Sequence, residues 1–136
     1  MAKAAGTSDR MLVYHFGSKA GVISAALGVI AARTMQALDT ALPVQRLPAE
    51  TLMTRLGEAM QDDGFRRPLA VFYELAALSL RGDETARGVG GRIAAHFQSW
   101  LAARLDAPER AGELLAAVEG WGVLTAVGLD LPFPSG

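Results

Sequence analysis

The sequence predicts an all-α fold, a helical bundle in a chain of 136 residues. Ala and Leu are abundant and the β-branched residues that favour strands are scarce. Apolar residues recur at helical spacing, and prolines, glycines and cap-forming residues separate the periodic segments. With 51% hydrophobic and 20% charged residues, the chain is expected to bury a core rather than remain disordered.

Cap residues and prolines bound three expected helices in the first half of the chain. Ser8 is a helix N-cap residue, and Ser18 caps the next helix after Gly17 ends the first. Pro43 stops the second helix, and Pro48 suits the first turn of the third. These helices are expected over residues 8–15, over residues 18–42 and in a segment that begins at Pro48.

Three more helices are expected in the second half, after a turn at residues 62–64. Gly82 breaks the chain after the fourth helix, and Asp83 is a cap residue for the fifth. Asp106 and Pro108 form a cap-and-proline restart before the last helix. The expected spans are residues 68–81, 85–105 and 108–131, followed by a frayed tail at residues 132–136.

The last two helices are apolar on more than one side. This pattern is typical of a helix at the centre of a domain or at a subunit interface. In so small a protein we expect a homodimer through these two helices, anchored by two tryptophans of the kind that dominate interfaces. The residues expected at the interface are Val89, Ile93, Trp100, Leu114, Val118, Trp121, Thr125 and Leu129.

The composition excludes several classes of site. There is no cysteine, and the two histidines, His15 and His96, are too few for a histidine-rich metal centre. We therefore expect neither a metal nor a cofactor. Gly-rich phosphate loops and the common hydrolase and metalloprotease motifs are absent, so an enzyme is not expected. No apolar run of about 18 residues and no signal peptide is recognised, so we expect a cytoplasmic protein with no membrane contact.

The most specific pattern lies at the start of the chain. Ala5 and Gly6 would close one helix and supply the turn glycine of a helix-turn-helix, and a short capped helix follows. That helix leads into the run Tyr14, His15, Phe16, Gly17, Ser18 and Lys19. The segment resembles the DNA-reading helix and the start of the fourth helix of the tetracycline-repressor-like (TetR) family of bacterial transcription regulators. The resemblance is strong over residues 3–27.

The resemblance implies a TetR-like helical bundle with a partial helix-turn-helix at the N-terminus and a two-helix C-terminal dimerisation face. Residues 1–20 would be the remnant of the DNA-binding domain, and residues 21–136 the effector-binding and dimerisation domain. The protein would be a homodimeric transcriptional regulator, a repressor, that releases operator DNA when a small apolar effector binds. The residues that would contact DNA are Thr7, Ser8, Asp9, Arg10, Tyr14, His15 and Lys19.

The resemblance also implies an effector pocket enclosed by the middle helices. We expect an apolar cavity between the long helix of residues 18–42 and the helices that carry Phe72 and Phe97. The candidate lining residues are Met35, Met53, Met60, Phe65, Phe72, Tyr73, His96, Phe97 and Trp100. The alternative is that such residues are simply core, and both interpretations stay open for each of them.

Several features depart from the family pattern. Val13 and Ala20 stand where the family usually has an aromatic and often has an acidic residue, respectively. The family's first helix and nearly all of its second precede the turn glycine, whereas residues 1–5 would supply at most one helical turn. With a net charge of −1 as well, we expect this chain to bind DNA weakly or not at all. The alternatives are a ligand-binding, dimer-forming module without DNA binding, or an unrelated helical enzyme or interaction domain.

Overall fold

The structure, a computed structural model, describes residues 19–136 and confirms the expected all-α class for them. Their helices are α2 (Lys19–Ala41), α3 (Ala49–Ala59), the 3-10 helix η2 (Asp63–Phe65), α4 (Arg66–Leu80), α5 (Glu84–Ala102), the 3-10 helix η3 (Pro108–Arg110) and α6 (Ala111–Ala126). The described residues contain no β-strand, only an isolated bridge between Leu47 and Leu105. The helix expected over residues 8–15 lies outside the described residues.

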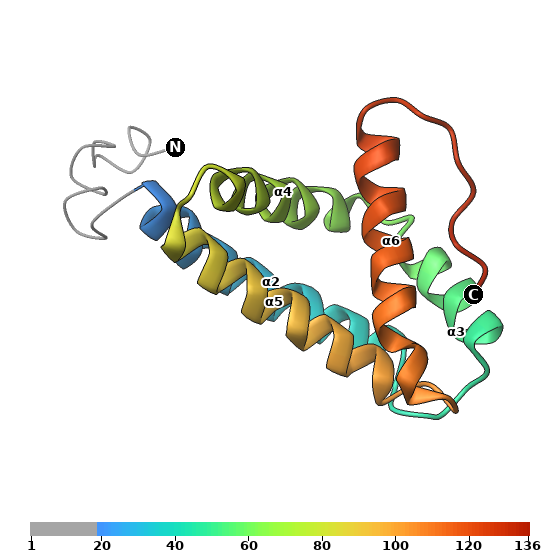
Figure 1. The fold of residues 1–136 in the computed structure, drawn as a ribbon. Coiled ribbons are helices and arrows are strands. Elements are labelled where there is room, and N and C mark those ends of the chain that lie inside the picture. The colour runs from blue at the N-terminus through green and yellow to red at the C-terminus, as the bar shows by residue number, and fades with distance from the viewer. Residues whose placement is uncertain (1–18) are drawn as a thin grey trace.

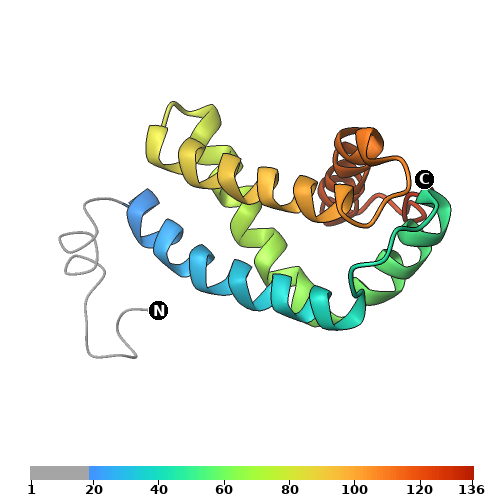
Figure 2. The same cartoon turned by 90° about the horizontal axis from the view of Figure 1, so that it is seen from below.

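Three helices form the long part of the molecule. α4 packs against both α2 and α5, which also contact each other (Figures 1 and 2). α6 contacts α5 and runs across the end of this layer, and the C-terminal tail returns from α6 to α3 (Figure 1). Near the place where α6 crosses this layer, helices from the first half of the chain therefore lie close to helices from the second half (Figure 1).

In the three-residue connection between α4 and α5, Gly82 ends the first helix and Asp83 caps the second. Gly82 has a φ of +97°, which a residue without a Cβ adopts easily, and its N–H donates to the Ser79 carbonyl over 3.0 Å. The Asp83 N–H donates to the Leu78 carbonyl over 3.1 Å, which completes a Schellman motif. The Asp83 carboxylate then accepts from the Ala86 N–H over 3.0 Å and caps α5. The expected break and cap at this point are confirmed.

The last helix ends earlier than expected. α6 stops at Ala126, before the expected end at residue 131. Gly128, with a φ of +95°, donates to the Thr125 carbonyl over 3.0 Å, and the Leu129 N–H donates to the Leu124 carbonyl over 3.1 Å. The apolar periodicity continues through this segment, so periodicity alone overestimated the helix and the glycine decided its end.

The tail packs against the protein, so the expectation that it frays is wrong. The Phe133 ring meets the Trp121 ring edge-on at a centroid distance of 4.9 Å. The Trp121 indole N–H donates to the Leu131 carbonyl over 3.1 Å. Phe133 also lies against Gly57 of α3, where an added Cβ would be 2.9 Å from the ring. The tail therefore joins α6 to α3.

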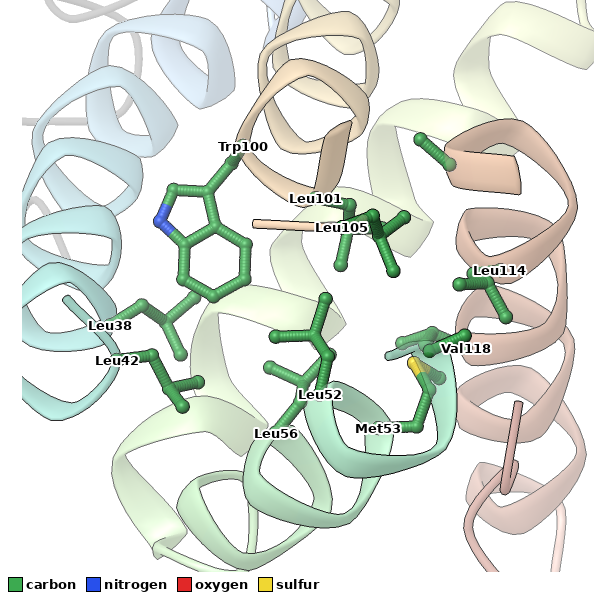
Figure 3. Close-up of a cluster of buried hydrophobic side chains, with 12 residues drawn as sticks. Leu38, Leu42, Leu52, Met53, Leu56, Trp100, Leu101, Leu105, Leu114 and Val118 are labelled. Carbon is green, nitrogen blue, oxygen red and sulfur yellow. The ribbon is translucent and has the colours of Figure 1, made fainter. Parts of the chain in front are cut away.

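The buried side chains form two separate clusters. The larger cluster, shown in Figure 3, gathers α3, α6 and the C-terminal ends of α2 and α5. Its members are Leu38, Leu42, Ala49, Leu52, Met53, Leu56, Trp100, Leu101, Leu105, Ala111, Leu114 and Val118. The smaller cluster, Leu27, Leu75 and Ala86, lies between α2, α4 and α5. Helices α2 and α5 contribute to both clusters and so connect them.

One helix bears on the expectation that no segment is long and apolar enough to cross a membrane. By length and composition alone, residues Gly21–Ala41 of α2 pass that test among the described residues. The core helix of a soluble protein and a signal sequence near the N-terminus pass the same test, and 12% of this window is buried, with Leu27 and Leu38 among the buried residues of α2.

Candidate ligand cavity

A cavity of about 570 Å³, partly open to solvent rather than enclosed as expected, lies between the two buried clusters. Leu27 of the smaller cluster and Ile93, which packs against that cluster, form part of the wall. Leu38 and Val118 of the larger cluster form another part. The wall therefore draws on α2, α5 and α6, together with residues of α4 such as Phe72. Its volume lies within the roughly 300–1,000 Å³ range of small-molecule sites.

Six of the nine expected lining residues lie in this wall: Met35, Met60, Phe65, Phe72, His96 and Phe97. The expectation is corrected for the other three. Met53 and Trp100 are buried in the larger cluster, and Tyr73 lines a second cavity of about 470 Å³ that is also bounded by Trp121 and Gly122. Helical periodicity assigns a residue to the inner face of a helix, but it does not say whether that residue meets a neighbour or a cavity.

A polar cluster ties α2 to α5 at one end of the cavity. Asp39, which lines the cavity, accepts two hydrogen bonds on Oδ1. One comes from the Trp100 indole N–H over 2.8 Å and the other from Arg104 Nη2 over 3.0 Å. The Trp100 ring stacks on the cavity residue Phe97 at a centroid distance of 5.7 Å. This arrangement fixes the orientation of the aromatic residues behind the wall.

Arg104 is the charged residue that the fold buries most deeply among the described residues, with 3% of its surface exposed. Besides Asp39, its guanidinium donates to the carbonyls of Leu42 over 2.8 Å and Trp100 over 3.2 Å. Burial lowers the pKa of Arg104, and the neighbouring Asp39 acts in the opposite direction. All of these groups belong to the same packed end of the molecule, so Arg104 has a structural role.

Glu119 of α6 also lines the cavity, but unlike Arg104 it lacks a hydrogen-bond partner among the described residues for a covered side-chain atom. Its side chain is half-buried, and its Oε2 atom is covered and has no hydrogen-bond partner within residues 19–136. Burial raises the pKa of the Glu119 carboxyl. The Tyr73 hydroxyl is likewise buried without a partner among these residues, and burial together with the charge of Glu119 raises the pKa of Tyr73 to about 12.

Sequence reasoning missed three charged side chains of this region: Asp39 and Glu119 of the cavity wall and the structural Arg104. For Glu119 a signal was present, because it is an acidic residue inside a helix that is otherwise apolar on nearly all sides. Arg104 follows Trp100 by one helical turn, which places both on one face. Asp39 lies between Leu38 and Thr40, and no local feature of the sequence distinguishes it from a solvent-facing residue.

The predicted dimer interface is only partly at the surface. Trp100, Leu114 and Val118 are buried within the larger cluster, so they present no surface to a partner and that part of the prediction is wrong. Val89 and Ile93 are half-buried beside the smaller cluster. Trp121 is covered in part by the tail, and Thr125 is half-buried.

Exposed apolar residues lie on the last turn of α6 and just after its end at Ala126. Leu129, another residue of the predicted interface, is 51% exposed, and Val127 is 77% exposed. Val123 and Leu124 are also exposed. We call these four residues the terminal apolar patch.

The predicted DNA-contacting residues Thr7, Ser8, Asp9, Arg10, Tyr14 and His15 lie outside the described residues. Lys19 begins α2. The fold and the cavity define the described part of the chain as an all-α body with an apolar, ligand-sized cavity between two cores. Comparisons with models of protein families, with curated proteins and with solved structures gave no match for this chain.

Proposed function

We propose that the protein is a cytoplasmic transcriptional regulator of the TetR type, a repressor, whose helical body binds a small, largely apolar effector. The observation that carries the proposal is the cavity of about 570 Å³ with six of the expected lining residues in its wall. The motif at the start of the chain, from Tyr14 to Lys19, supports the link to DNA.

The position of α2 supports a coupling between the effector and DNA. α2 follows directly on the segment that resembles the reading helix, and it contributes Leu27, Met35 and Asp39 to the cavity wall. A ligand that binds better to one placement of α2 would favour that placement, which is a shift between existing populations. The reading helix would then change its position together with the start of α2.

The terminal apolar patch supports a homodimer. Exposed apolar residues gathered at the end of one helix often mark a contact with another protein. In this proposal two copies meet through this end of α6, which sets the spacing of the two reading segments on operator DNA.

Ligand binding is tested by thermal shift against hydrophobic small molecules. Binding to the native state should raise the melting temperature of the wild-type protein. Ala31 lines the cavity, so Ala31→Phe should fill part of it and weaken that shift. Ala37→Phe on the same helix, at an exposed position away from the cavity, is the matched control. A screen without any stabilising compound would contradict the proposal.

DNA binding is tested by gel shift with the promoter region upstream of the protein's own gene. The 136-residue chain should bind weakly or not at all. In a form with a complete helix-turn-helix, Lys19→Ala should weaken binding about equally across sequences, whereas changes at Ser8 or Arg10 should alter sequence preference. The second candidate is a ligand-binding, dimer-forming module without DNA binding, which the net charge of −1 favours. Ligand-induced stabilisation without any salt-sensitive DNA complex in the form with a complete helix-turn-helix would favour that module.

A further inference from the structure

The cavity wall holds one acidic group that the protein itself leaves without a partner. Glu119 projects from α6 and lines the cavity, and its Oε2 atom is covered without any hydrogen bond within residues 19–136. The other acidic residue of the wall, Asp39, accepts hydrogen bonds from Trp100 and Arg104. Within the described residues its carboxylate is therefore already engaged, whereas the carboxylate of Glu119 is not.

No cation of the described residues neutralises Glu119. The ion pairs found among residues 19–136 join Arg66 to Asp63, Arg104 to Asp39 and Arg110 to Glu113. The basic residues of the wall are Arg92 and His96, and both are exposed to solvent. Arg92 Nη1 lies 3.6 Å from the position of a Cβ added at Gly88, toward the N-terminal end of α5.

A covered carboxylate is unfavourable unless a donor reaches it. Removal from water without a compensating hydrogen bond costs free energy, and the cost is larger for a charge than for a neutral group. Oε2 itself has almost no exposed surface, so a cationic donor in the cavity would form a charge-assisted hydrogen bond with the accessible part of the Glu119 carboxylate and offset part of this cost. Burial raises the pKa of Glu119, which agrees with a carboxyl that lacks such a donor.

We propose that the cavity binds amphipathic amines, whose apolar body contacts the apolar wall and whose protonated nitrogen donates to the Glu119 carboxylate. This inference rests on the proposed function of the cavity as a ligand site, and it names the chemical class of the ligand. The apolar residues Met35, Phe72 and Phe97 contact the body of the ligand, and Glu119 selects its charge.

Three compounds with one shared apolar body test the inference by isothermal titration calorimetry on the wild-type chain. They are 1-(2-aminoethyl)naphthalene, which is protonated near neutrality, 1-(2-hydroxyethyl)naphthalene and 1-ethylnaphthalene. The ammonium compound should bind about tenfold or more tightly than ethylnaphthalene, with the alcohol between them. In Glu119→Gln this preference should fall below about threefold while the affinity for ethylnaphthalene stays the same.

Glu58→Gln, which removes an exposed carboxylate of α3 away from the cavity, is the matched control and should keep the preference. Far-UV circular dichroism verifies the fold of each variant, and the wild-type comparison stands without any variant. If all three compounds bind alike, or if the preference survives in Glu119→Gln, the inference is overturned and the cavity remains a ligand site. If none of the three binds, both the inference and the proposed ligand site fail.

Discussion

Gly122 of α6 lies directly against the side chain of Tyr73 on α4. A Cβ added there would overlap the hydroxyl of Tyr73 on α4 and would lie 3.4 Å from the ring carbon that bears it. The glycine therefore admits the Tyr73 ring, and the hydroxyl itself has no hydrogen-bond partner among the described residues. The close contact depends on one oxygen atom, which makes it testable by paired substitutions.

Gly122→Ala should destabilise the protein by about 1–3 kcal/mol, because the added methyl group overpacks the contact. Tyr73→Phe removes the obstructing oxygen, so the double variant should regain most of the loss. Gly120→Ala on the same helix, where an added Cβ meets nothing within 4 Å, is the control and should stabilise by up to about 1 kcal/mol. Urea denaturation measures all four variants, and purely additive effects of Gly122→Ala and Tyr73→Phe would contradict the steric explanation.

Glu119 should make stability depend on pH in a defined direction. Because its pKa is raised in the folded state, the carboxyl favours folding at acidic pH, and that stability is lost as pH rises through the folded pKa. Glu119→Gln should therefore be more stable than the wild type by about 1–2 kcal/mol at neutral pH, and the difference should vanish under acidic conditions.

Thermal denaturation of the wild type and Glu119→Gln from acidic to neutral pH tests this prediction. The titratable and charged groups that share the surroundings of Glu119 are Tyr73 of α4, Arg92 and His96 of α5 and Asp39 of α2. The comparison is repeated in a His96→Gln background, so that the histidine does not contribute. A variant less stable than the wild type at neutral pH would mean that Glu119 has a stabilising partner.

At the scale of elements, the sequence predicted helix ends best where the chemistry is local. Gly82 and Asp83 act through their own backbone and side-chain atoms, so the break and the cap were predictable. The end of α6 was misjudged because the apolar pattern of Val127 and Leu129 continues after Gly128 has already reversed the chain.

Asp83→Ala should destabilise the protein by about 0.5–2 kcal/mol, because the Ala86 N–H, which has no partner within the first turn of α5, loses its acceptor. Asp83→Asn keeps a side-chain oxygen at the same place and should retain most of the stability. Chemical denaturation compares the two variants. Equal losses for Asp83→Ala and Asp83→Asn would show that the negative charge near the helix start, and not the cap hydrogen bond, stabilises α5.

At the scale of the whole molecule, helical periodicity does not distinguish a residue of the cavity wall from a residue of the core. Met35 and Phe97 line the cavity whereas Met53 and Trp100 fill a core, although all four occupy the inner faces of their helices. The difference depends on which neighbouring helix packs against each of these positions, and that is a property of the assembled fold. The same limit explains why Leu114 and Val118 were assigned to an interface although both are buried in the larger cluster, where Met53 of α3 lies beside Val118 (Figure 3).

If the terminal apolar patch joins two copies, a charge within it should separate them. Val127→Glu and Leu129→Glu should convert a dimer to a monomer at micromolar concentration, measured by light scattering, with little change in the fold of the monomer. Val118→Glu is unsuitable because Val118 is buried and the charge would disrupt the core. Arg67→Glu, at an exposed position of α4, is the control. A wild-type protein that is monomeric would remove this element of the proposal.

The separation of the two buried clusters has a consequence for how the molecule opens. The cluster of Leu27, Leu75 and Ala86 is small, and the cavity limits its packing against the larger one. Sub-global opening at this end should therefore require less free energy than global unfolding, so amides of α4 and the first half of α5 should exchange with deuterium faster than those of α6. An occupant of the cavity would contact both clusters and make them open together, which would slow exchange at residues that touch no ligand.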